Sequence, residues 1–218
     1  MKLNEIKGQA VFYDVDTQND FLNADGALYV QDAESLKPNL ERLTQYALNK
    51  GIKILGSVDC HSKGDAELER NGGPFPDHCM KGTFGAKKIK ETNQENISYI
   101  PNETLSSAEL YKKIELAESV FFEKQHYDVF TNPCASLLLC QPKFVVLYGV
   151  ATDFCIKAAA LGMRERGVEV HVVEDAIKGV FPDKTKEALD EMKEAGVKFI
   201  KTQDVLDGLV ENLYRMQR

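Results

Sequence analysis

The sequence predicts an α/β fold: a three-layer, doubly wound sheet, mostly parallel and of about six strands. Short apolar runs alternate along the chain with segments whose apolar residues recur every three or four positions, the spacing of an amphipathic helix. Such a β-α-β order implies parallel strands with helices on both faces, joined by right-handed crossovers. The 218 residues, 43% hydrophobic and 28% charged, suit a single domain spanning residues 1–218.

The individual elements follow from these patterns. Six apolar runs are expected to form strands: Ala10–Val15, Ile52–Val58, Ser119–Lys124, Lys143–Tyr148, Val168–Val173 and Val197–Lys201. Four segments are expected to form helices: Leu36–Lys50, Asp153–Gly167, Lys184–Ala195 and Asp204–Met216. Gly51 and Gly196 follow two of these helices, at the position where glycine often ends a helix. The one long irregular stretch is Asp59–Ala86, and loops of this length are usually functional.

Composition excludes several classes of partner. The net charge of -7 argues against nucleic acid, whose phosphates require a basic surface. No apolar run reaches the roughly 18 residues that span a bilayer, and the N-terminus has no signal-peptide pattern. The five cysteines are an odd number, which indicates free thiols in a reducing compartment. We therefore expect a cytoplasmic protein, and homo-oligomerisation stays open.

Charged and reactive side chains stand at the ends of four predicted strands. They are Asp14 and Asp16, Asp59 and His61, Lys124, and the segment Gly149–Cys155. In doubly wound folds the active site lies beyond the carboxyl ends of the strands. We therefore expect these residues to share one pocket.

Cys155 is a candidate nucleophile. A buried strand runs through a turn into an Ala-rich helix at this point, with Thr152 as the expected N-cap. Unpaired N–H groups and the helix dipole would favour a thiolate there and could bind an oxyanion. The alternative is a buried structural cysteine, which is common.

A nucleophilic thiol needs a base, and the sequence offers several. Asp14 and Asp16 are two residues apart on a strand, so both are expected on the same side; the alternative for either is a turn or helix cap. His126 also stays a candidate, whereas His171 lies inside a predicted strand and is expected to be structural. Lys124 could orient the base and stabilise negative charge, or extend to solvent.

A third group of residues has the character of a metal site. Asp59 and His61 are predicted on one strand face, His78 follows in a Gly/Pro-rich loop, and Glu67 lies between them. One Asp, one Glu and two His suit a divalent transition metal with positions left for water or substrate. The simplest alternative is that the D-x-H motif is surface decoration.

A structural zinc site from Cys60, His61, His78 and Cys79 is a further alternative. It is disfavoured because residues 60 and 61 point to opposite strand faces.

Taken together, these segments resemble the isochorismatase-like cysteine hydrolases. The matching segments are Asp16–Phe21 (DTQNDF), Asp59–His61 (DCH), Phe75–Thr83 (FPDHCMKGT), Phe122–Lys124 (FEK) and Gly149–Cys155 (GVATDFC). The resemblance implies that Asp16 is the base, Lys124 the catalytic lysine and Cys155 the nucleophile. It also implies a cis peptide between Val150 and Ala151, with the N–H groups of Ala151 and Cys155 forming the oxyanion hole.

The metal segment indicates the nicotinamidase branch of that family. There the resemblance implies hydrolysis of nicotinamide to nicotinate and ammonia through a cysteine thioester, with one divalent metal ion holding the pyridine nitrogen. Zinc is the first expectation, and iron or manganese are alternatives. The ligands would be Asp59, His61, Glu67 and His78, with Glu67 preferred over Glu69 because Asp65–Leu68 (DAEL) resembles the family's D-P-E-F.

By family position, Phe21 and Phe75 would contact the substrate ring. The competing predictions are a related hydrolase acting on another small amide or N-carbamoyl compound, and a non-catalytic binding protein of the same fold.

Overall fold

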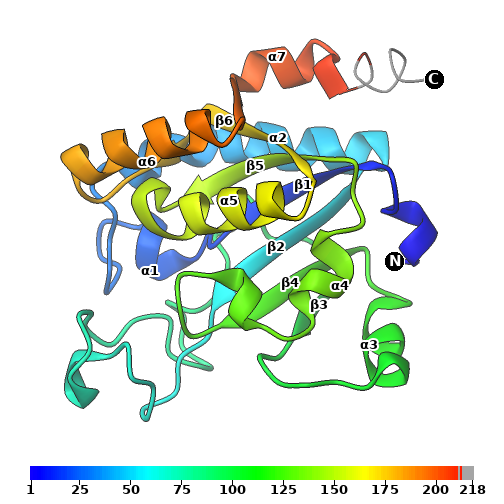
Figure 1. Cartoon of the computed structure of the whole chain (residues 1–218). Helices are drawn as coiled ribbons and strands as arrows, with labels where there is room; N and C mark the ends of the chain where they lie inside the picture. The colour runs from blue at the N-terminus through cyan, green and yellow to red at the C-terminus, as the bar shows by residue number, and fades with distance from the viewer. Residues whose placement is uncertain (211, 213–218) are drawn as a thin grey trace.

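The protein forms a parallel seven-stranded sheet in the order β3-β4-β2-β1-β5-β6-β7 (Figure 1). The computed structural model describes residues 1–210 and 212. The strands are β1 (Ala10–Val15), β2 (Lys53–Asp59), β3 (Ile97–Ile100), β4 (Ser119–Lys124), β5 (Phe144–Val150), β6 (Glu169–Lys178) and β7 (Lys198–Ile200). The predicted doubly wound α/β fold is therefore confirmed, with seven strands where about six were expected.

The strand that the sequence did not predict is β3. It has four residues, only one of them fully buried, and it pairs with β4 alone at one edge of the sheet. An edge strand this short and this exposed has no continuous apolar run to mark it.

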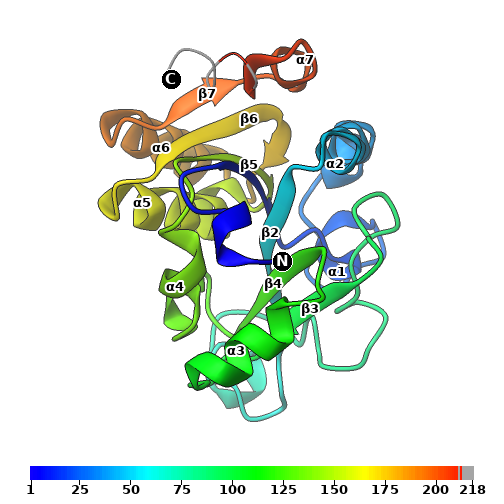
Figure 2. The ribbon, with the colours of Figure 1, turned by 90° about the vertical axis from the view of Figure 1, so that its right-hand side faces the viewer.

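The helices divide into two layers, one on each face of the sheet (Figure 2). The first layer comprises α3 (Ser107–Ile114), α4 (Ala135–Leu139), α5 (Lys157–Glu165) and α6 (Pro182–Glu194). The second comprises α1 (Asn19–Leu22), α2 (Lys37–Lys50) and α7 (Thr202–Leu206). Among the described residues, no helix is long and apolar enough to cross a membrane. The closing helix, predicted to reach Met216, is interrupted: α7 ends at Leu206, a turn follows at residues 207–208, and residues 209, 210 and 212 are helical again. Residues 211 and 213–216 of that prediction lie outside the described residues.

The strand order reverses at β1, which has β2 on one side and β5 on the other. Parallel pairing aligns the carboxyl ends of these strands, so that Val15 lies beside both Ser57 and Gly149, while Asp59 lies beside Lys124. This is the crevice where ligands bind in open α/β sheets. Residues distant in sequence are thereby brought to one place.

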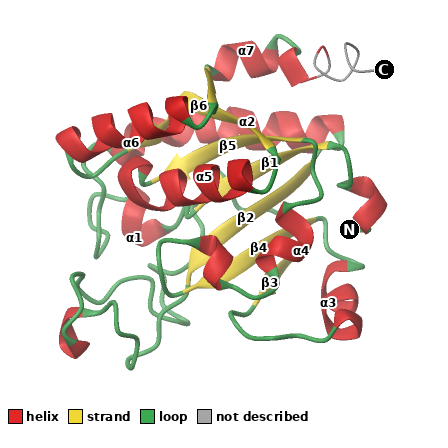
Figure 3. Cartoon of the chain, in the orientation of Figure 1, coloured by secondary structure: helices red, strands yellow, loops and turns green. Residues whose placement is uncertain are grey.

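A long loop follows β2 and runs from residue 60 to residue 96 (Figure 3). It is fixed to α1 by Asp20, which accepts a hydrogen bond from the Cys79 N–H at 2.6 Å. The approach is so close that a Cβ at Gly85 would lie 2.1 Å from the Asp20 carboxylate oxygens. Glycine is therefore required where the loop passes α1.

Candidate active site

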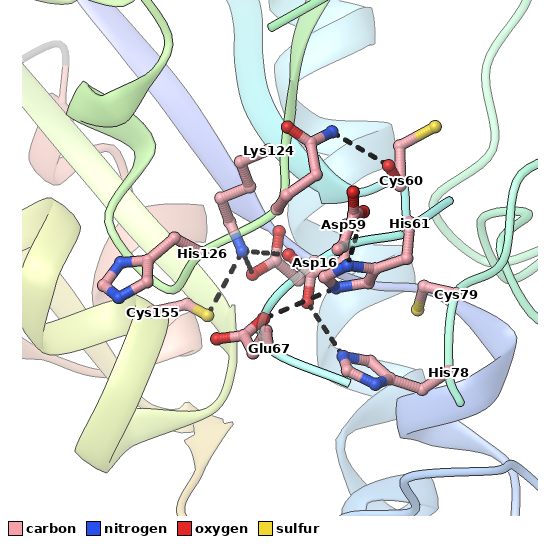
Figure 4. Close-up of polar contacts among 12 residues, drawn as sticks. Asp16, Asp59, Cys60, His61, Glu67, His78, Cys79, Lys124, His126 and Cys155 are labelled. Atoms are coloured by element: carbon pink, nitrogen blue, oxygen red, sulfur yellow. Dashed lines mark hydrogen bonds and ion pairs between the residues drawn. The ribbon is translucent and has the colours of Figure 1, made fainter. Parts of the chain in front are cut away.

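Asp16, Lys124 and Cys155 meet beyond the carboxyl ends of β1, β4 and β5 (Figure 4). The Lys124 Nζ lies 2.9 Å from Asp16 Oδ2 and 3.3 Å from Cys155 Sγ. The thiol of Cys155 and the carboxylate of Asp16 lie close enough to shift each other's pKa. A nucleophile, a carboxylate and a cation are therefore in mutual contact, as acyl transfer through a thiol requires.

The backbone turns the side chain of Asp16 to the opposite side of the sheet from that of Asp14. Asp16 is in the left-handed region with φ 49°, a conformation that aspartate tolerates better than most residues. The Ser57 hydroxyl donates to its Oδ1 at 2.8 Å. Asp14 instead bonds to Lys88 and Thr17. The expectation that the two carboxylates share a side was wrong, because the strand ends at Val15 and the next residue turns.

Lys124 is fully buried and keeps its charge. Its Nζ contacts carboxylate oxygens of both Asp16 and Asp59. Burial lowers the pKa of Lys124, but the two carboxylates outweigh that effect and raise it well above its ordinary value. The alternative in which this lysine extends to solvent is excluded by its 0% side-chain exposure.

Cys155 lies within a π-helical turn, Thr152–Ile156, that precedes α5. The N-cap of this turn is Ala151 and not Thr152, and the hydroxyl of Thr152 is buried without a partner. The predicted cap was wrong because the wider turn begins one residue earlier, with the Ile156 N–H donating to the Ala151 carbonyl. The Val150–Ala151 peptide is cis, as predicted.

The electrostatic balance favours a protonated thiol at rest. Burial raises the pKa of Cys155 well above its ordinary value; Lys124 opposes this, while Asp16 and Asp59 add to it. This direction runs against the expectation of a thiolate, because burial and two carboxylates outweigh the lysine. Burial likewise raises the pKa of Asp16, which Lys124 partly offsets. A carboxylate with a raised pKa, in contact with the thiol, is a suitable proton acceptor.

The metal-type residues lie next to this cluster. Asp59, His61 and His78 each offer a ligand atom, and these atoms lie within 4.8 Å of one another. Glu67 Oε2 is 3.4 Å from His61 Nε2, and the carboxylate lines the same cavity as Asp59 and His78. Burial, and then the Asp59 charge, raise the pKa of Glu67 to about 7. The structure therefore brings all four predicted ligands together.

The hydrogen bonds of these residues suit a metal ion. His78 Nδ1 donates to the Pro76 carbonyl at 2.8 Å, and His61 Nδ1 donates to Asp65 Oδ2 at 3.2 Å. Both Nε2 atoms are thus left with a lone pair, and that of His61 is buried without a hydrogen-bond partner. Outer hydrogen bonds of this kind orient histidine ligands in metal sites.

The carboxylate of Asp59 connects the two clusters. One oxygen contacts Lys124, and the other lies 3.6 Å from His78 Nε2. Burial would raise the pKa of Asp59, but the charge of Lys124 and the contacts with His78 and Lys124 lower it to about 2. Asp59 is therefore ionised and available as a ligand.

The group of potential ligands that the structure brings together contains no cysteine among the described residues. In Figure 4 the sulfur of Cys60 points away from the histidines, and Cys79 is buried in the apolar core. The alternative of a structural zinc site at these cysteines is not supported.

A cavity of about 70 Å³ joins the two clusters and opens to solvent. Its lining includes Cys155, Ala151, Asp59, Glu67 and His78, with the aromatic residues Phe21, Tyr29, Phe75, Tyr127 and Phe154. Phe21 and Phe75 face the His78 ring at centroid distances of 5.7 and 6.0 Å. A flat apolar ligand with one or two polar atoms fits such a lining.

The remaining histidines do not line the cavity that contains Cys155. His126 packs on Tyr127, with ring centroids 4.0 Å apart, and lines an outer cavity that contains neither Cys155 nor Asp16. His171 Nε2 lies 2.8 Å from Glu169 Oε1, a hydrogen-bond distance, on β6, in agreement with its predicted structural role.

Sequence reasoning gave no role to Gln18, although it stands in the matched DTQNDF segment. Its side chain accepts from the Asp59 N–H at 2.7 Å and donates to the Asp59 carbonyl at 2.8 Å. This two-point contact fixes the end of β2. Gln18 belongs to the matched motif, but only the fold shows that its side chain binds the end of β2.

Residues 12–204 match the isochorismatase domain family. The chain belongs to the isochorismatase family. This confirms the family inferred from the five segments.

Several known proteins are similar to this family member. Nicotinamidase from Escherichia coli (strain K12) is 26% identical, over 84% of this chain and 90% of its own length. Isochorismatase family protein 2A of Dictyostelium discoideum is 32% identical, but the match covers only 44% of this chain and 50% of that protein. A protein of Arabidopsis thaliana described as a probable inactive nicotinamidase is 27% identical, over 84% and 88%.

Among solved structures, the pyrazinamidase of Pyrococcus horikoshii in complex with zinc is 28% identical. It covers 88% of this chain and 99% of its own, with a TM-score of 0.71. A zinc-bound relative and the donor set of Asp59, His61 and His78 together support a divalent metal ion at this site.

Proposed function

We propose that this isochorismatase family member is a nicotinamidase, which hydrolyses nicotinamide to nicotinate and ammonia. The observation that carries the proposal is the single cavity that exposes both Cys155 and the Asp59/His78 pair. A carboxamide at the thiol and a ring nitrogen at the histidines are two points of recognition that nicotinamide satisfies. The similarity to the Escherichia coli and Pyrococcus horikoshii enzymes supports the same substrate class.

In the first half-reaction, Asp16 accepts the proton of the Cys155 thiol as the sulfur attacks the carboxamide carbon. The new C–S bond converts the carbonyl oxygen to an oxyanion, for which the backbone N–H groups of Ala151 and Cys155 are the proposed donors. The C–N bond then breaks, and Asp16 returns its proton to the nitrogen, which leaves as ammonia. Lys124 stabilises the negative charge that forms.

In the second half-reaction, water hydrolyses the thioester. Asp16 takes one water proton while the oxygen attacks the acyl carbon. The C–S bond breaks, the proton returns to the sulfur of Cys155, and nicotinate leaves with the cavity restored. Phe21 and Phe75 would hold the ring in place throughout, so that the carboxamide carbon stays oriented toward the Cys155 sulfur.

Asp59, His61, Glu67 and His78 are the proposed ligands of one divalent transition metal ion, with zinc first and iron or manganese as alternatives. When bound, the ion would supply a Lewis-acidic position for the pyridine nitrogen. The residues around it orient the ring and exclude water from the rest of the cavity.

An ammonia-release assay tests the proposal. The protein should release one ammonia per nicotinate formed, and brief acid quenching should leave a nicotinoyl adduct on the Cys155 peptide in mass spectrometry. Benzamide, which has the same shape without the ring nitrogen, is the matched control and should react much more slowly. If pyrazinamide or an N-carbamoyl compound is the better substrate, the hydrolase assignment survives and nicotinamide does not.

A further inference from the structure

A second buried lysine lies on the other face of the sheet, and the proposed mechanism does not use it. Lys88 has 0% side-chain exposure, and its Nζ lies 2.7 Å from Asp14 Oδ2. The same Nζ lies 4.2 Å from the ring centroid of Phe121. A fully buried ion pair is weak evidence for stability, since apolar residues could fill the same space. The presence of a buried lysine at residue 88 therefore needs an explanation other than stability.

The contacts of Lys88 bracket the proposed base. Asp14 is two residues before Asp16 and Thr17 is one residue after it. The ammonium donates to Asp14 Oδ2 and to Thr17 Oγ1, both at 2.7 Å, and the Thr17 hydroxyl donates to Asp14 Oδ1 at 2.8 Å. One side chain thus closes a ring of hydrogen bonds across the residue that leaves the strand.

The backbone reinforces this ring. The Ile89 N–H donates to the Thr17 carbonyl at 2.9 Å, and Lys88 forms an antiparallel bridge with Gln18. The Thr92 hydroxyl lies 2.6 Å from that of Thr17. The loop that carries Lys88 is therefore attached to the chain on the far side of Asp16.

Asp16 needs such support because of its backbone. A non-glycine residue with φ 49° persists where its surroundings hold it. On its own side of the sheet, the carboxylate is held by Ser57 and Lys124. On the opposite side, Lys88 holds Asp14 and Thr17, which lie two residues before and one residue after Asp16.

We propose that Lys88, acting through Asp14 and Thr17, is a positioning residue that holds the base Asp16 against the Cys155 thiol. The catalytic part of this inference rests on the proposed function. Its geometric part, the placement of Asp16 beside Cys155, can be tested without any substrate.

The decisive variant is Asp14→Asn/Lys88→Met, which removes both charges together and leaves no unpaired buried ion. We expect a folded protein with wild-type metal content and a KM within about twofold of wild type, because the metal ligands are untouched. The kcat should fall by about tenfold or more, since small misplacements of a catalytic group are costly. Thr17→Val, which breaks only the hydroxyl connection, should act in the same direction if the double variant does not fold.

The substrate-free readout is the pH dependence of Cys155 alkylation by iodoacetamide, followed on the Cys155 peptide by mass spectrometry. Burial and the Asp16 charge both raise the pKa of this thiol, so Asp16→Asn should lower the apparent pKa of Cys155. The size of that shift is the maximum against which the other variants are compared. The Asp14→Asn/Lys88→Met variant should move in the same direction by part of that amount. His171→Gln is the matched control, because it changes another buried side chain that is hydrogen-bonded to a carboxylate and has no link to Asp16, and it should lower the melting temperature alone.

A folded double variant with wild-type kcat and an unchanged thiol pKa would overturn the proposal. So would an equal loss of kcat in His171→Gln, which would mark a general effect of stability. If the wild-type protein releases no ammonia from nicotinamide, the substrate assignment fails, and the alkylation profile alone decides the role of Lys88.

Discussion

The two faces of the sheet each bury a lysine against aspartate, and the two pairs differ in what else they touch. Lys124 contacts Asp16, Asp59 and the Cys155 thiol, beside an open cavity that Cys155 and Asp59 line. Lys88 contacts Asp14, a threonine hydroxyl and an aromatic face, and neither it nor Asp14 lines that cavity. Burial is thus similar in both places, but it lowers the pKa of Lys88, which has one aspartate beside it, whereas two carboxylates raise the pKa of Lys124.

The difference teaches that a buried lysine–aspartate pair is suited to chemistry when further ionisable groups contact it, such as a second carboxylate and a thiol. Burial and the carboxylates around Lys124 raise the pKa of Cys155, and this thiol lines an open cavity. The polar atoms around Lys88 are all satisfied by one another. The first pair is suited to chemistry and the second to holding the chain in place.

The largest expected effect belongs to the reactive side of this comparison. Cys155→Ala should reduce nicotinamide hydrolysis by about 10⁵-fold or more, the scale seen when a nucleophile is removed. Its melting temperature should change little, because a small side chain replaces another at the wall of a cavity. Ammonia release and thermal unfolding measure the two effects. Wild-type turnover in this variant would end the covalent mechanism.

The next effect separates the two aspartates directly. Asp16→Asn removes the proton acceptor, and kcat should fall by about 10³-fold, within the range for a general base. Asp14→Asn keeps an acceptor for Lys88 and Thr17 and should cost about tenfold at most, with a lower melting temperature. Steady-state kinetics and thermal unfolding of both variants decide the matter. Equal losses of kcat would mean that the two sides of the sheet are not distinct in function.

The fold could be predicted from local patterns in the sequence. The candidate site could be predicted from motif residues at the strand ends, but the family resemblance was needed to choose among them. Apolar runs mark strands such as Ser119–Lys124, whose bounds agree with β4, and the motif residues stand at the strand ends. What could not be predicted depends on a single torsion angle or on a distant contact. The turn at Asp16 separates it from Asp14, and the partner of Asp14 is 74 residues away. No spacing rule contains that information.

The metal site should show an intermediate effect. His61→Ala removes a buried nitrogen that has no hydrogen-bond partner, so metal affinity should fall by about 10- to 100-fold. The KM for nicotinamide should rise, while alkylation of Cys155 by a small reagent stays near the wild-type rate. Metal analysis and kinetics at limiting and saturating zinc measure this.

His171→Ala is a control that removes a histidine without touching a proposed ligand. Full metal content with an unchanged KM in the His61→Ala protein would remove the main support for nicotinamide as the substrate.

The smallest expected effect is a shift in pH dependence. Burial raises the pKa of Asp16 above its ordinary value, and the base acts only when deprotonated. As the pH falls, kcat/KM should therefore be lost at a higher pH than the value of about 3.9 for an ordinary aspartate. Zinc must be kept in excess, because acid also protonates histidine ligands.

Ser57→Ala removes a hydrogen bond donated at 2.8 Å to the Asp16 carboxylate. Losing a bond that favours the charged form should move this acid limb upward again, by about one pH unit or less. An acid limb at the ordinary aspartate value, unmoved in Ser57→Ala, would show that Asp16 is not the group whose ionisation limits the reaction.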